Sequence, residues 1–276
     1  MNLPQTWTNA RYFRSALKRP WGRALLYPFF SLHPRPVFLL GNQKSGTTAI
    51  AKLLALAAGK TEETYLRGFS QHILEDLYHN RLPLKEAIRR RAKFEFSREL
   101  IKECNLTFFY PQLRALYPDA PKVFIVRDPR DNIRSILHFV QVPGNLHRIA
   151  PAGLPEMLEW QRILDNSWLG VQGAHYIDSM AGRWVKAAEV YLQSPSEFIL
   201  VRYEDFKAAK TDTIHALCDA LHLPVQADIA PYLEVPFQPP GPPSASWIAF
   251  FGENNLNRLE QICSGRMREF GYFPSL

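Results

Sequence analysis

Cysteine is scarce in this chain of 276 residues, and its three cysteines lie far apart. Cys104, Cys218 and Cys263 form no CxxC pair and have none of the spacings with which proteins ligate zinc. An odd number of widely spaced cysteines argues against a disulfide framework and favours a reducing compartment. We therefore expect three packing residues in a cytoplasmic protein.

Long apolar runs are also absent. No run of about 18 apolar residues occurs, so the sequence predicts no membrane-spanning helix. Residues 1–35 contain no apolar signal-peptide core and form instead an arm that mixes basic with aromatic side chains. Packing on the protein's own surface is our first interpretation of this arm, and peripheral contact with an anionic membrane is the alternative.

Zinc-finger, basic-zipper and aromatic RNA-binding motifs are missing as well, so nucleic acid is not an expected partner. The net charge of +7 nevertheless favours anionic ligands or surfaces. Hydrophobic residues make up 46% of the chain, enough to bury a sizeable core. The length suits one large α/β domain over 1–276, with a proline-rich surface loop at 236–252.

The first informative stretch reads as strand, loop and helix. Residues 37–40 are an apolar run typical of a strand buried on both faces. Gly41 and Gly46 then bracket a polar loop, and apolar residues recur at helical spacing as far as Ala57. The backbone N–H groups of such a loop and the positive end of the following helix form an anion site suited to a phosphate.

This loop departs from the usual phosphate-binding motif at one position. The spacing between Gly41 and Gly46, followed by two threonines, matches the motif. Nucleoside triphosphatases carry a lysine directly after the second glycine, whereas this chain has Thr47 there and places Lys44 inside the loop. A lysine at that place would face the bridging and terminal oxygens of a shorter, diphosphate-like group.

A second apolar run, 123–126, predicts another buried parallel strand, which ends at Arg127 and Asp128. Ligands of open α/β sheets bind outside the carboxyl ends of the strands. Arg127 at such an end and Ser135, about two turns down the next helix, could grip a second phosphate, because the planar guanidinium matches phosphate geometry. The alternative is a structural ion pair between Arg127 and Asp128.

Further helices and strands are expected to alternate. We expect helix over 66–103, a third strand at about 184–192, an apolar run at 198–201 and a closing helix over 255–270 that Gly271 ends. This alternation predicts a P-loop-like, three-layer α/β sandwich with a central, mainly parallel sheet and helices on both faces.

Three motifs occur in order: Gln43-Lys-Ser-Gly-Thr-Thr48, Val126-Arg-Asp-Pro-Arg-Asp-x3-Ser135 and Val201-Arg-Tyr-Glu-Asp205, the last preceded by Trp184 and Tyr191. Together they resemble the sulfotransferases that use 3′-phosphoadenosine 5′-phosphosulfate (PAPS). The similarity runs from about residue 37 to residue 272. It is closer to the carbohydrate- and protein-modifying branches and their bacterial relatives than to the phenol- and steroid-modifying branch.

The resemblance implies roles for the matching positions. Arg127 and Ser135 would hold the 3′-phosphate, and Tyr203 would sit near the adenine. The 5′-phosphosulfate loop would consist of Lys44, Ser45, Gly46, Thr47 and Thr48. A donor of this kind needs no lysine after the second glycine and no metal ion, and the product would be adenosine 3′,5′-bisphosphate (PAP).

Two departures from the family pattern concern the nucleotide. Many cytosolic members carry a tryptophan after the two threonines, where this chain has Ala49, and an Arg-Lys-Gly triplet near the C-terminus, which is missing here. Trp247, Phe250 and Phe251 are candidates to replace these contacts.

The resemblance also implies a general base. In the branches just named it is a glutamate about twenty residues past the basic residue of the loop, which points to Glu63, with Glu62 second. Adjacent carboxylates repel, and this raises the affinity of one of them for a proton. The alternatives are a solvated acidic pair at a helix end, and His72 as the base, since the phenol-modifying branch uses a histidine.

The sequence thus predicts transfer of a sulfuryl group from PAPS to a hydroxyl of an acceptor, by in-line displacement. The acceptor would be a glycan, a lipid-linked molecule or a small molecule, including an anionic one. A nucleotide or small-molecule kinase with a divergent phosphate loop is the alternative, and Thr47 argues against it. A binding module that kept the loop without the chemistry is a third hypothesis.

Overall fold

The computed structural model describes residues 30–273 except 67, 70, 151–152, 172, 236 and 238–245. Within these residues, five parallel strands form one sheet in the order β2-β3-β1-β4-β5. The strands are β1 (Val37–Gly41), β2 (Glu62–Glu63), β3 (Leu100–Lys102), β4 (Lys122–Val126) and β5 (Ile199–Arg202). The predicted parallel sheet is therefore confirmed.

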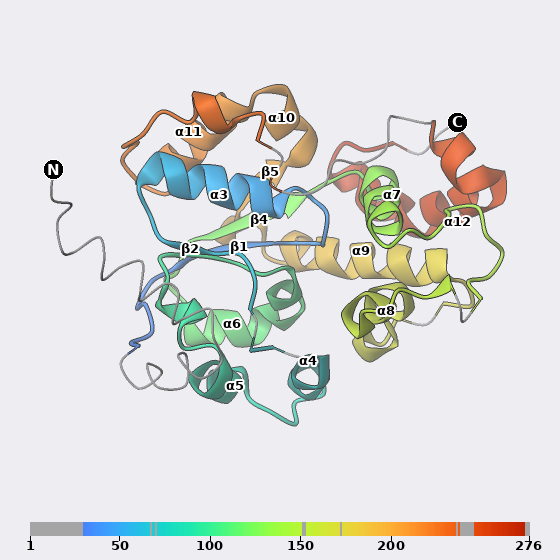
Figure 1. The fold of residues 1–276 in the computed structure, drawn as a ribbon, viewed down its shortest axis with the longest axis horizontal. Helices are drawn as coiled ribbons and strands as arrows, with labels where there is room; N and C mark the ends of the chain where they lie inside the picture. Colours follow the sequence, from blue (N-terminus) through green and yellow to red (C-terminus); the bar gives the residue numbers. More distant parts are fainter. Residues whose placement is uncertain are drawn as a thin grey trace, which may run out of the picture.

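Helices cover both faces of the sheet and continue beyond the carboxyl ends of its strands (Figure 1). One face carries α3 (Thr47–Ala58), α10 (Tyr203–Ala208) and α11 (Lys210–Ala220). The opposite face carries α4 (Gln71–Tyr78), α5 (Leu84–Arg91) and α6 (Tyr110–Leu116). A third group is α7 (Pro129–Phe139), α8 (Leu158–Asp165), α9 (Tyr176–Leu192) and α12 (Trp247–Glu269).

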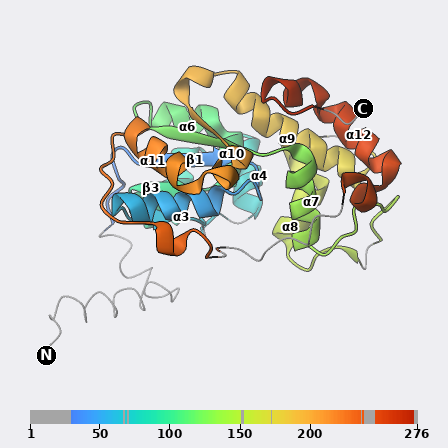
Figure 2. The ribbon, with the colours of Figure 1, turned by 90° about the horizontal axis from the view of Figure 1, so that it is seen from above.

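This third group packs together at one end of the molecule (Figure 2). Helix α9 contacts α7, α8 and α12, and α7 also contacts α12. Turned by 90°, the molecule shows α3 and α11 alongside the sheet, while α7 and α8 lie past its end. The carboxyl ends of the strands therefore point toward the space between these two sets of helices.

The central strands are apolar because helices bury both of their faces. Successive side chains of β1 point to opposite sides, so Phe38 and Leu40 enter the core on the side of α4–α6 while Leu39 enters the core under α3 and α11. All three are fully buried. Burial of such a side chain stabilises the fold by about 1.5–3 kcal/mol.

Two predicted elements are wrong. Residues 184–192, expected as a strand, form the second half of α9. One side of this helix packs into the hydrophobic core, and another side packs against α12. Apolar residues therefore occur too densely along it to show a helical period. Segment 66–103, expected as helical, contains α4, α5 and the short strand β3.

The ends of the chain agree in part with expectation. Helix α12 begins at Trp247, inside the predicted loop 236–252, and Gly271 follows its end with a φ of 73° as expected. Most of the predicted arm and residues 238–245 of the loop lie outside the described residues, so membrane contact stays a prediction.

Two other expectations can be compared directly with the structure. Cys104, Cys218 and Cys263 are free and buried, which confirms them as packing residues. Nowhere in the described chain is there a helix long and apolar enough to cross a membrane.

Candidate active site

The loop between β1 and α3 follows a backbone path that requires its glycines. Gly41 has a φ of 139°, and a Cβ there would lie 2.2 Å from the carbonyl oxygen of Ile125 on the neighbouring strand β4. Gly46 has a φ of 86°, and its Cβ would lie 2.2 Å from the Tyr203 ring. Lys44 also has a positive φ, 63°, which costs a non-glycine residue about 1–2 kcal/mol.

Lys44 and Arg127 lie next to each other at the ends of two paired strands, β1 and β4. Arg127 Nη1 donates a hydrogen bond to the Lys44 carbonyl oxygen at 3.0 Å, and the Arg127 guanidinium lies 4.5 Å from the Tyr203 ring centroid. Arg127 Nε is buried and has no hydrogen-bond partner among the described residues. Such a donor is expected to be satisfied by water or by a bound group.

The predicted alternative, an ion pair between Arg127 and Asp128, is not formed. Asp128 instead accepts from Arg130 Nη2 at 2.6 Å and from the Arg130 backbone at 2.9 Å as the N-cap of α7. Arg127 is thus free of a carboxylate partner in the described structure, as a residue that recognises a phosphate would be.

The two strand ends diverge at this point. The chain leaves β1 into α3, on one face of the sheet, and leaves β4 into α7, whose apolar side chains join the opposite core. Such a divergence opens a crevice outside the carboxyl ends of the strands, where α/β proteins bind their ligands. Lys44 and Arg127 lie at this place, just past the ends of β1 and β4.

A buried hydrogen-bond network of Arg183 and several amide side chains fixes the loop between β1 and α3. Arg183 on α9 is fully buried and donates to Gln43 Oε1 at 2.6 Å, Asn42 Oδ1 at 3.1 Å and Asn166 Oδ1 at 3.0 Å. Asn132 Nδ2 donates to the Gln43 carbonyl at 2.7 Å. Burial lowers the pKa of Arg183 to about 9. Its charge is thus offset by amide oxygens of the loop, which fixes their positions.

The nucleotide side of the site contains the remaining predicted contacts. Ser45 is buried, and its Oγ accepts from Asn132 Nδ2 at 3.0 Å. Thr47 and Thr48 are the first two residues of α3. Ser135 lies two turns into α7 and is partly exposed. The roles of these residues toward a nucleotide stay predictions.

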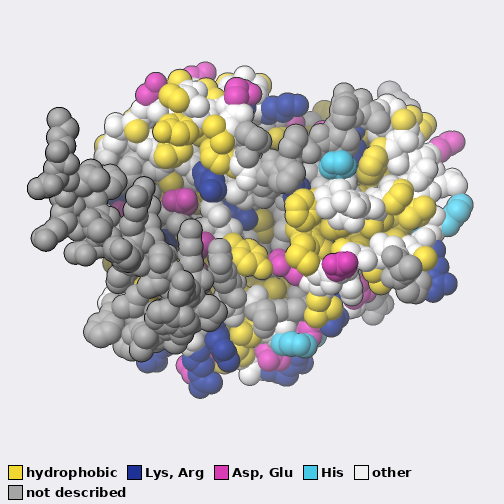
Figure 3. Space-filling model, in the orientation of Figure 1, with side chains coloured by type: hydrophobic (Ala, Val, Ile, Leu, Met, Phe, Trp, Pro, Cys, Tyr) yellow, Lys and Arg dark blue, Asp and Glu magenta, His cyan; other side chains and the backbone are white. Residues whose placement is uncertain are grey.

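A cavity of about 360 Å³ adjoins the loop. Its aromatic walls include Phe139 and Trp160, whose ring centroids are 4.6 Å apart, and Lys44 Nζ lies 4.7 Å from the centroid of Phe139. Figure 3 shows hydrophobic side chains over the face that carries α7 and α8, where Met157 is exposed. The lining comprises Gln43, Lys44, Thr47, Thr48, Thr64, Tyr65, Lys102, Glu103, Cys104, Phe139, Met157, Glu159 and Trp160.

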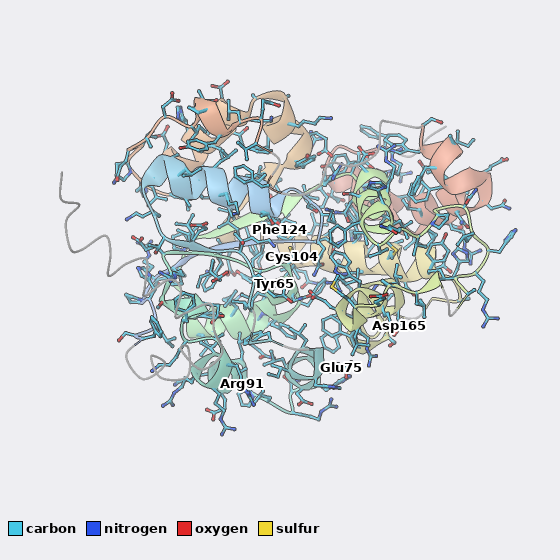
Figure 4. All side chains as sticks on the ribbon, in the orientation of Figure 1. Tyr65, Glu75, Arg91, Cys104, Phe124 and Asp165 are labelled. Carbon is cyan, nitrogen blue, oxygen red and sulfur yellow. The ribbon has the colours of Figure 1, made fainter. Side chains whose placement is uncertain are left out.

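Charges in this cavity shift the pKa of Lys44. Burial lowers it, and the positive charges of Arg127 and Lys102 lower it further. An anion bound among these three cations would reverse this effect by favouring the charged ammonium. Lys44 and Lys102 therefore make part of the cavity wall electropositive, and Tyr65 and Cys104, labelled in Figure 4, line the same cavity.

The residues predicted as the general base lie at the edge of the sheet. Glu62 and Glu63 form β2, and Glu63 Oε1 accepts from the backbone N–H groups of Thr64 and Tyr65 at 3.1 and 3.2 Å. Neither glutamate is among the described residues that line the cavity, and His72 is exposed on α4. Their assignment as the base stays a prediction.

Sequence reasoning missed several residues of the site. Lys102 ends β3 and donates from Nζ to the Thr64 carbonyl at 3.3 Å, while Glu159 on α8 enters the cavity from a segment with no motif. Arg183 is also missed; it lies on α9 just before the predicted strand 184–192, and none of the three motifs includes it. Asn132 lies within the second motif, but at one of its three unspecified positions, so the motif does not mark it.

Three features of the site fit a nucleotide that carries two anionic groups. They are the loop of N–H groups at the start of α3, the adjacent Lys44, and the unpartnered Nε of Arg127. Within the described residues no cluster of histidine, cysteine, aspartate or glutamate could hold a metal ion.

Comparisons with known proteins identify the family. Residues 34–233 match the model of the sulfotransferase domain. Flavonol 3-sulfotransferase of Flaveria bidentis is 28% identical over 206 residues, which are 74% of this chain and 62% of the relative. Flavonol 4'-sulfotransferase of Flaveria chlorifolia is 27% identical over 214 residues, 74% of this chain and 60% of the relative. The chain thus spans about three fifths of the length of these curated relatives.

Solved structures share the fold at low sequence identity. Sulfotransferase STF1 from Mycobacterium tuberculosis H37Rv has a TM-score of 0.54 at 15% identity, with 94% of this chain and 85% of that chain covered. Mouse sulfotransferase SULT7A1, complexed with PAP, has a TM-score of 0.51 at 13% identity, with 88% of each chain covered. These similarities confirm the predicted P-loop-like α/β fold.

The two curated relatives are named for flavonols, so the predicted closeness to the carbohydrate- and protein-modifying branches stays a prediction. The family itself is shown, because its model matches 34–233 of the 276 residues. This chain belongs to the family of PAPS-dependent sulfotransferases.

Proposed function

We propose that the protein transfers the sulfuryl group of PAPS to a hydroxyl of a small organic acceptor and releases PAP. The observation that carries this proposal is the pairing of Lys44 with Arg127 at the ends of adjacent strands, beside a cavity. Lys44 lies in the anion loop, and the buried Nε of Arg127 has no partner among the described residues, which supports contacts with two separate anionic groups of one nucleotide.

The residues of the chain divide the work as follows. Lys44 and the N–H groups at the start of α3 would hold the 5′-phosphosulfate and stabilise the charge that grows on the phosphate during transfer. Arg127 and Ser135 would hold the 3′-phosphate, and Tyr203, which already lies against Gly46 and Arg127, would contact the adenine. PAPS supplies the sulfuryl group.

The acceptor is proposed to be a small molecule with an aromatic or similarly apolar body. A cavity of about 360 Å³ with Tyr65, Phe139 and Trp160 in its walls suits such a molecule better than an extended glycan. The flavonols in the names of the two curated relatives are molecules of this class. Because Lys44, Thr47 and Thr48 line the cavity, a hydroxyl there would approach the sulfuryl group, which supports in-line displacement.

Ligand-induced stabilisation tests the donor. We expect PAP to raise the melting temperature and ATP with Mg²⁺ to leave it nearly unchanged, because the loop suits a phosphosulfate and not a triphosphate. A ligand at a hundred times its dissociation constant adds about 2.7 kcal/mol to the free energy of unfolding. Stabilisation by ATP and Mg²⁺ but not by PAP would favour the kinase instead.

Lys44→Ala tests the chemistry. We expect turnover to fall by about 10²–10³-fold, the usual effect of removing one preorganised donor from the charge that develops in the transition state. PAP should still stabilise the variant, since the loop N–H groups and Arg127 remain. Lys52→Ala, on helix α3 that follows the loop and outside the cavity lining, is the control. Full activity of Lys44→Ala contradicts the role of Lys44.

A further inference from the structure

Two carboxylates, those of Glu103 and Glu159, line the cavity, and they differ in how many of their oxygens accept hydrogen bonds from the protein. Glu103 is buried and uses both: Oε1 accepts from the Asn105 backbone at 2.9 Å, and Oε2 accepts from the Leu66 backbone at 3.2 Å. Glu159 Oε2 accepts from the Tyr65 hydroxyl at 3.1 Å. Its second oxygen, Oε1, has no hydrogen-bond partner among the described residues, and so it can receive a proton from a molecule in the cavity.

Glu159 is also held in position for such a transfer. The Tyr65 hydroxyl fixes one oxygen, and the side chain is only partly exposed on the first turn of α8. Lys44 and Lys102 line the same cavity as Glu159. The Glu159 carboxylate therefore lines the same cavity as Lys44, the residue that would contact the donor.

The surroundings of Glu159 raise the pKa of its carboxyl, which makes it a stronger base. Burial raises the pKa of this carboxyl, and the negative charge of Glu103 raises it further, while the Tyr65 hydrogen bond and the charges of Arg183 and Lys102 oppose part of the shift. A general base works best when its pKa approaches the operating pH.

The glutamates expected from spacing are placed differently. Glu63 Oε1 already accepts two backbone N–H groups, and Glu62 pairs in register with Leu100, whose side chain lies in the core under α3. Side chains of paired residues in a parallel sheet share a face, so Glu62 points to the α3 side. Glu159 is the carboxylate that lines the cavity and keeps one oxygen without a hydrogen-bond partner among the described residues.

We propose, building on the proposed function, that Glu159 is the general base of sulfuryl transfer. Its Oε1 takes the proton of the acceptor hydroxyl while the hydroxyl oxygen bonds to sulfur. At the same time the bond between sulfur and the bridging oxygen of the 5′-phosphate breaks, and its electron pair stays on the phosphate. The proton on Glu159 then passes to water. Tyr65 is a positioning residue for this carboxylate.

Glu159→Gln tests the proposal with two phenols of different acidity. Phenol, like tyrosine, ionises near pH 10, whereas para-nitrophenol ionises near neutral pH and needs little help from a base. We expect Glu159→Gln to lower kcat with phenol by about 10²–10⁴-fold and kcat with para-nitrophenol far less. The acid limb of the pH profile with phenol should disappear as well.

Two matched variants and two further measurements complete the test. Glu156→Gln changes an exposed glutamate three residues earlier and should keep the wild-type rate. Glu63→Gln changes the residue expected from spacing, so that the two candidate bases are compared directly. PAP affinity reports whether the nucleotide half of each variant is intact. Release of PAP from PAPS, with water as the acceptor, is followed in all variants, so that the result does not depend on acceptance of a phenol.

Equal loss of rate with both phenols, or an unchanged rate of Glu159→Gln with phenol and with water, overturns the role of Glu159. So does a loss confined to Glu63→Gln. A wild-type protein that binds no PAP contradicts the proposed function itself, and this outcome is recognised before any variant is compared.

Discussion

At the scale of single residues, Arg127 joins the parts of the nucleotide site. Its Nη1 holds the Lys44 carbonyl, its guanidinium lies over the Tyr203 ring, and its Nε remains without a partner among the described residues. A contact between Arg127 and the 3′-phosphate would therefore also affect the loop that is proposed to hold the 5′-phosphosulfate. Lysine could supply the charge but not this planar arrangement.

We predict that Arg127→Lys weakens PAP binding by about 10–150-fold, corresponding to the 1.5–3 kcal/mol typical of hydrogen bonds to charged groups. Affinity for AMP, which lacks the 3′-phosphate, should change much less. Calorimetric titration with both nucleotides measures the difference. Equal losses for PAP and AMP would mean that Arg127 supports the loop without recognising the 3′-phosphate.

Glu159 gives a second prediction at this scale, on stability. Burial raises the pKa of its carboxyl above the ordinary value of 4.5, so the folded protein binds this proton more tightly than the unfolded chain. The stability that Glu159 contributes is therefore present below pH 4.5 and is lost as the pH rises through the folded-state pKa. The ionised carboxylate opposes folding at neutral pH.

Glu159→Gln should accordingly melt at a higher temperature than the wild type at neutral pH, with the difference shrinking as the pH falls below 4.5. Thermal unfolding monitored by circular dichroism across this range measures the effect. Glu156→Gln, which alters an exposed side chain, should follow the wild type. A constant difference at every pH would show that packing, and not charge, is responsible.

Sequence alone located one half of the candidate site better than the other. Lys44 and Arg127 could be predicted because each follows an apolar strand in a motif of fixed spacing. Glu159 could not, because α8 brings it to the cavity through tertiary packing and no local pattern marks it. The spacing that pointed to Glu63 led to a carboxylate at the sheet edge, whose role remains a prediction.

At the scale of elements, the end of β1 depends on a threonine far along the chain. Thr107, in the 3₁₀ helix Cys104–Phe109, is fully buried. Its Oγ1 accepts from the Gly41 N–H at 2.9 Å and donates to the Gly41 carbonyl at 3.1 Å. The last residue of the strand is thereby satisfied just before the chain turns into the anion loop.

Thr107→Val should lower the free energy of unfolding by about 1–3 kcal/mol for each backbone group of Gly41 left without a partner. The side chain keeps its shape, so the loss reports on the hydroxyl. Urea unfolding measures it. Thr107→Ser, which retains the hydroxyl, should lose clearly less, and equal losses in the two variants would contradict the explanation.

The elements themselves could be predicted where burial alone decides the pattern. The runs 37–40 and 123–126 became β1 and β4 because helices cover both of their faces. Strands β2 and β3 have two and three residues, too few to show a pattern, and they form because they pair with the sheet. The second half of α9, residues 184–192, is largely apolar, and its sequence therefore predicts a strand instead of a helix.

At the scale of the molecule, α12 extends the fold beyond the matched range 34–233. It packs against α7 and α9, and its Glu260 accepts from Arg130 Nη1 at 3.0 Å, next to the Asp128 cap of α7. The Trp247 ring lies 3.7 Å from the Arg130 guanidinium. Trp247 thus supports the second motif through Arg130, and Phe251, one turn further along α12, is buried in the core.

Net charge gives a prediction for the whole molecule. An excess of +7 and the cluster of Lys44, Lys102 and Arg127 at one crevice should attract a nucleotide with several negative charges. We expect the association rate of PAP to fall at least about tenfold as the Debye length drops from about 30 Å at 0.01 M salt to about 8 Å at 0.15 M. Stopped-flow fluorescence measures it, with uncharged adenosine as the control.

The contact between Gly46 and the Tyr203 ring restricts the order in which this protein can change. Any side chain at position 46 would collide with the ring, and the backbone there has a φ of 86° that disfavours one in any case. A smaller residue at 203 has to arise first, and it removes the stacking surface beside Arg127. If Tyr203 contacts the adenine as proposed, mutational paths away from this glycine pass through an intermediate that has already lost part of the nucleotide site.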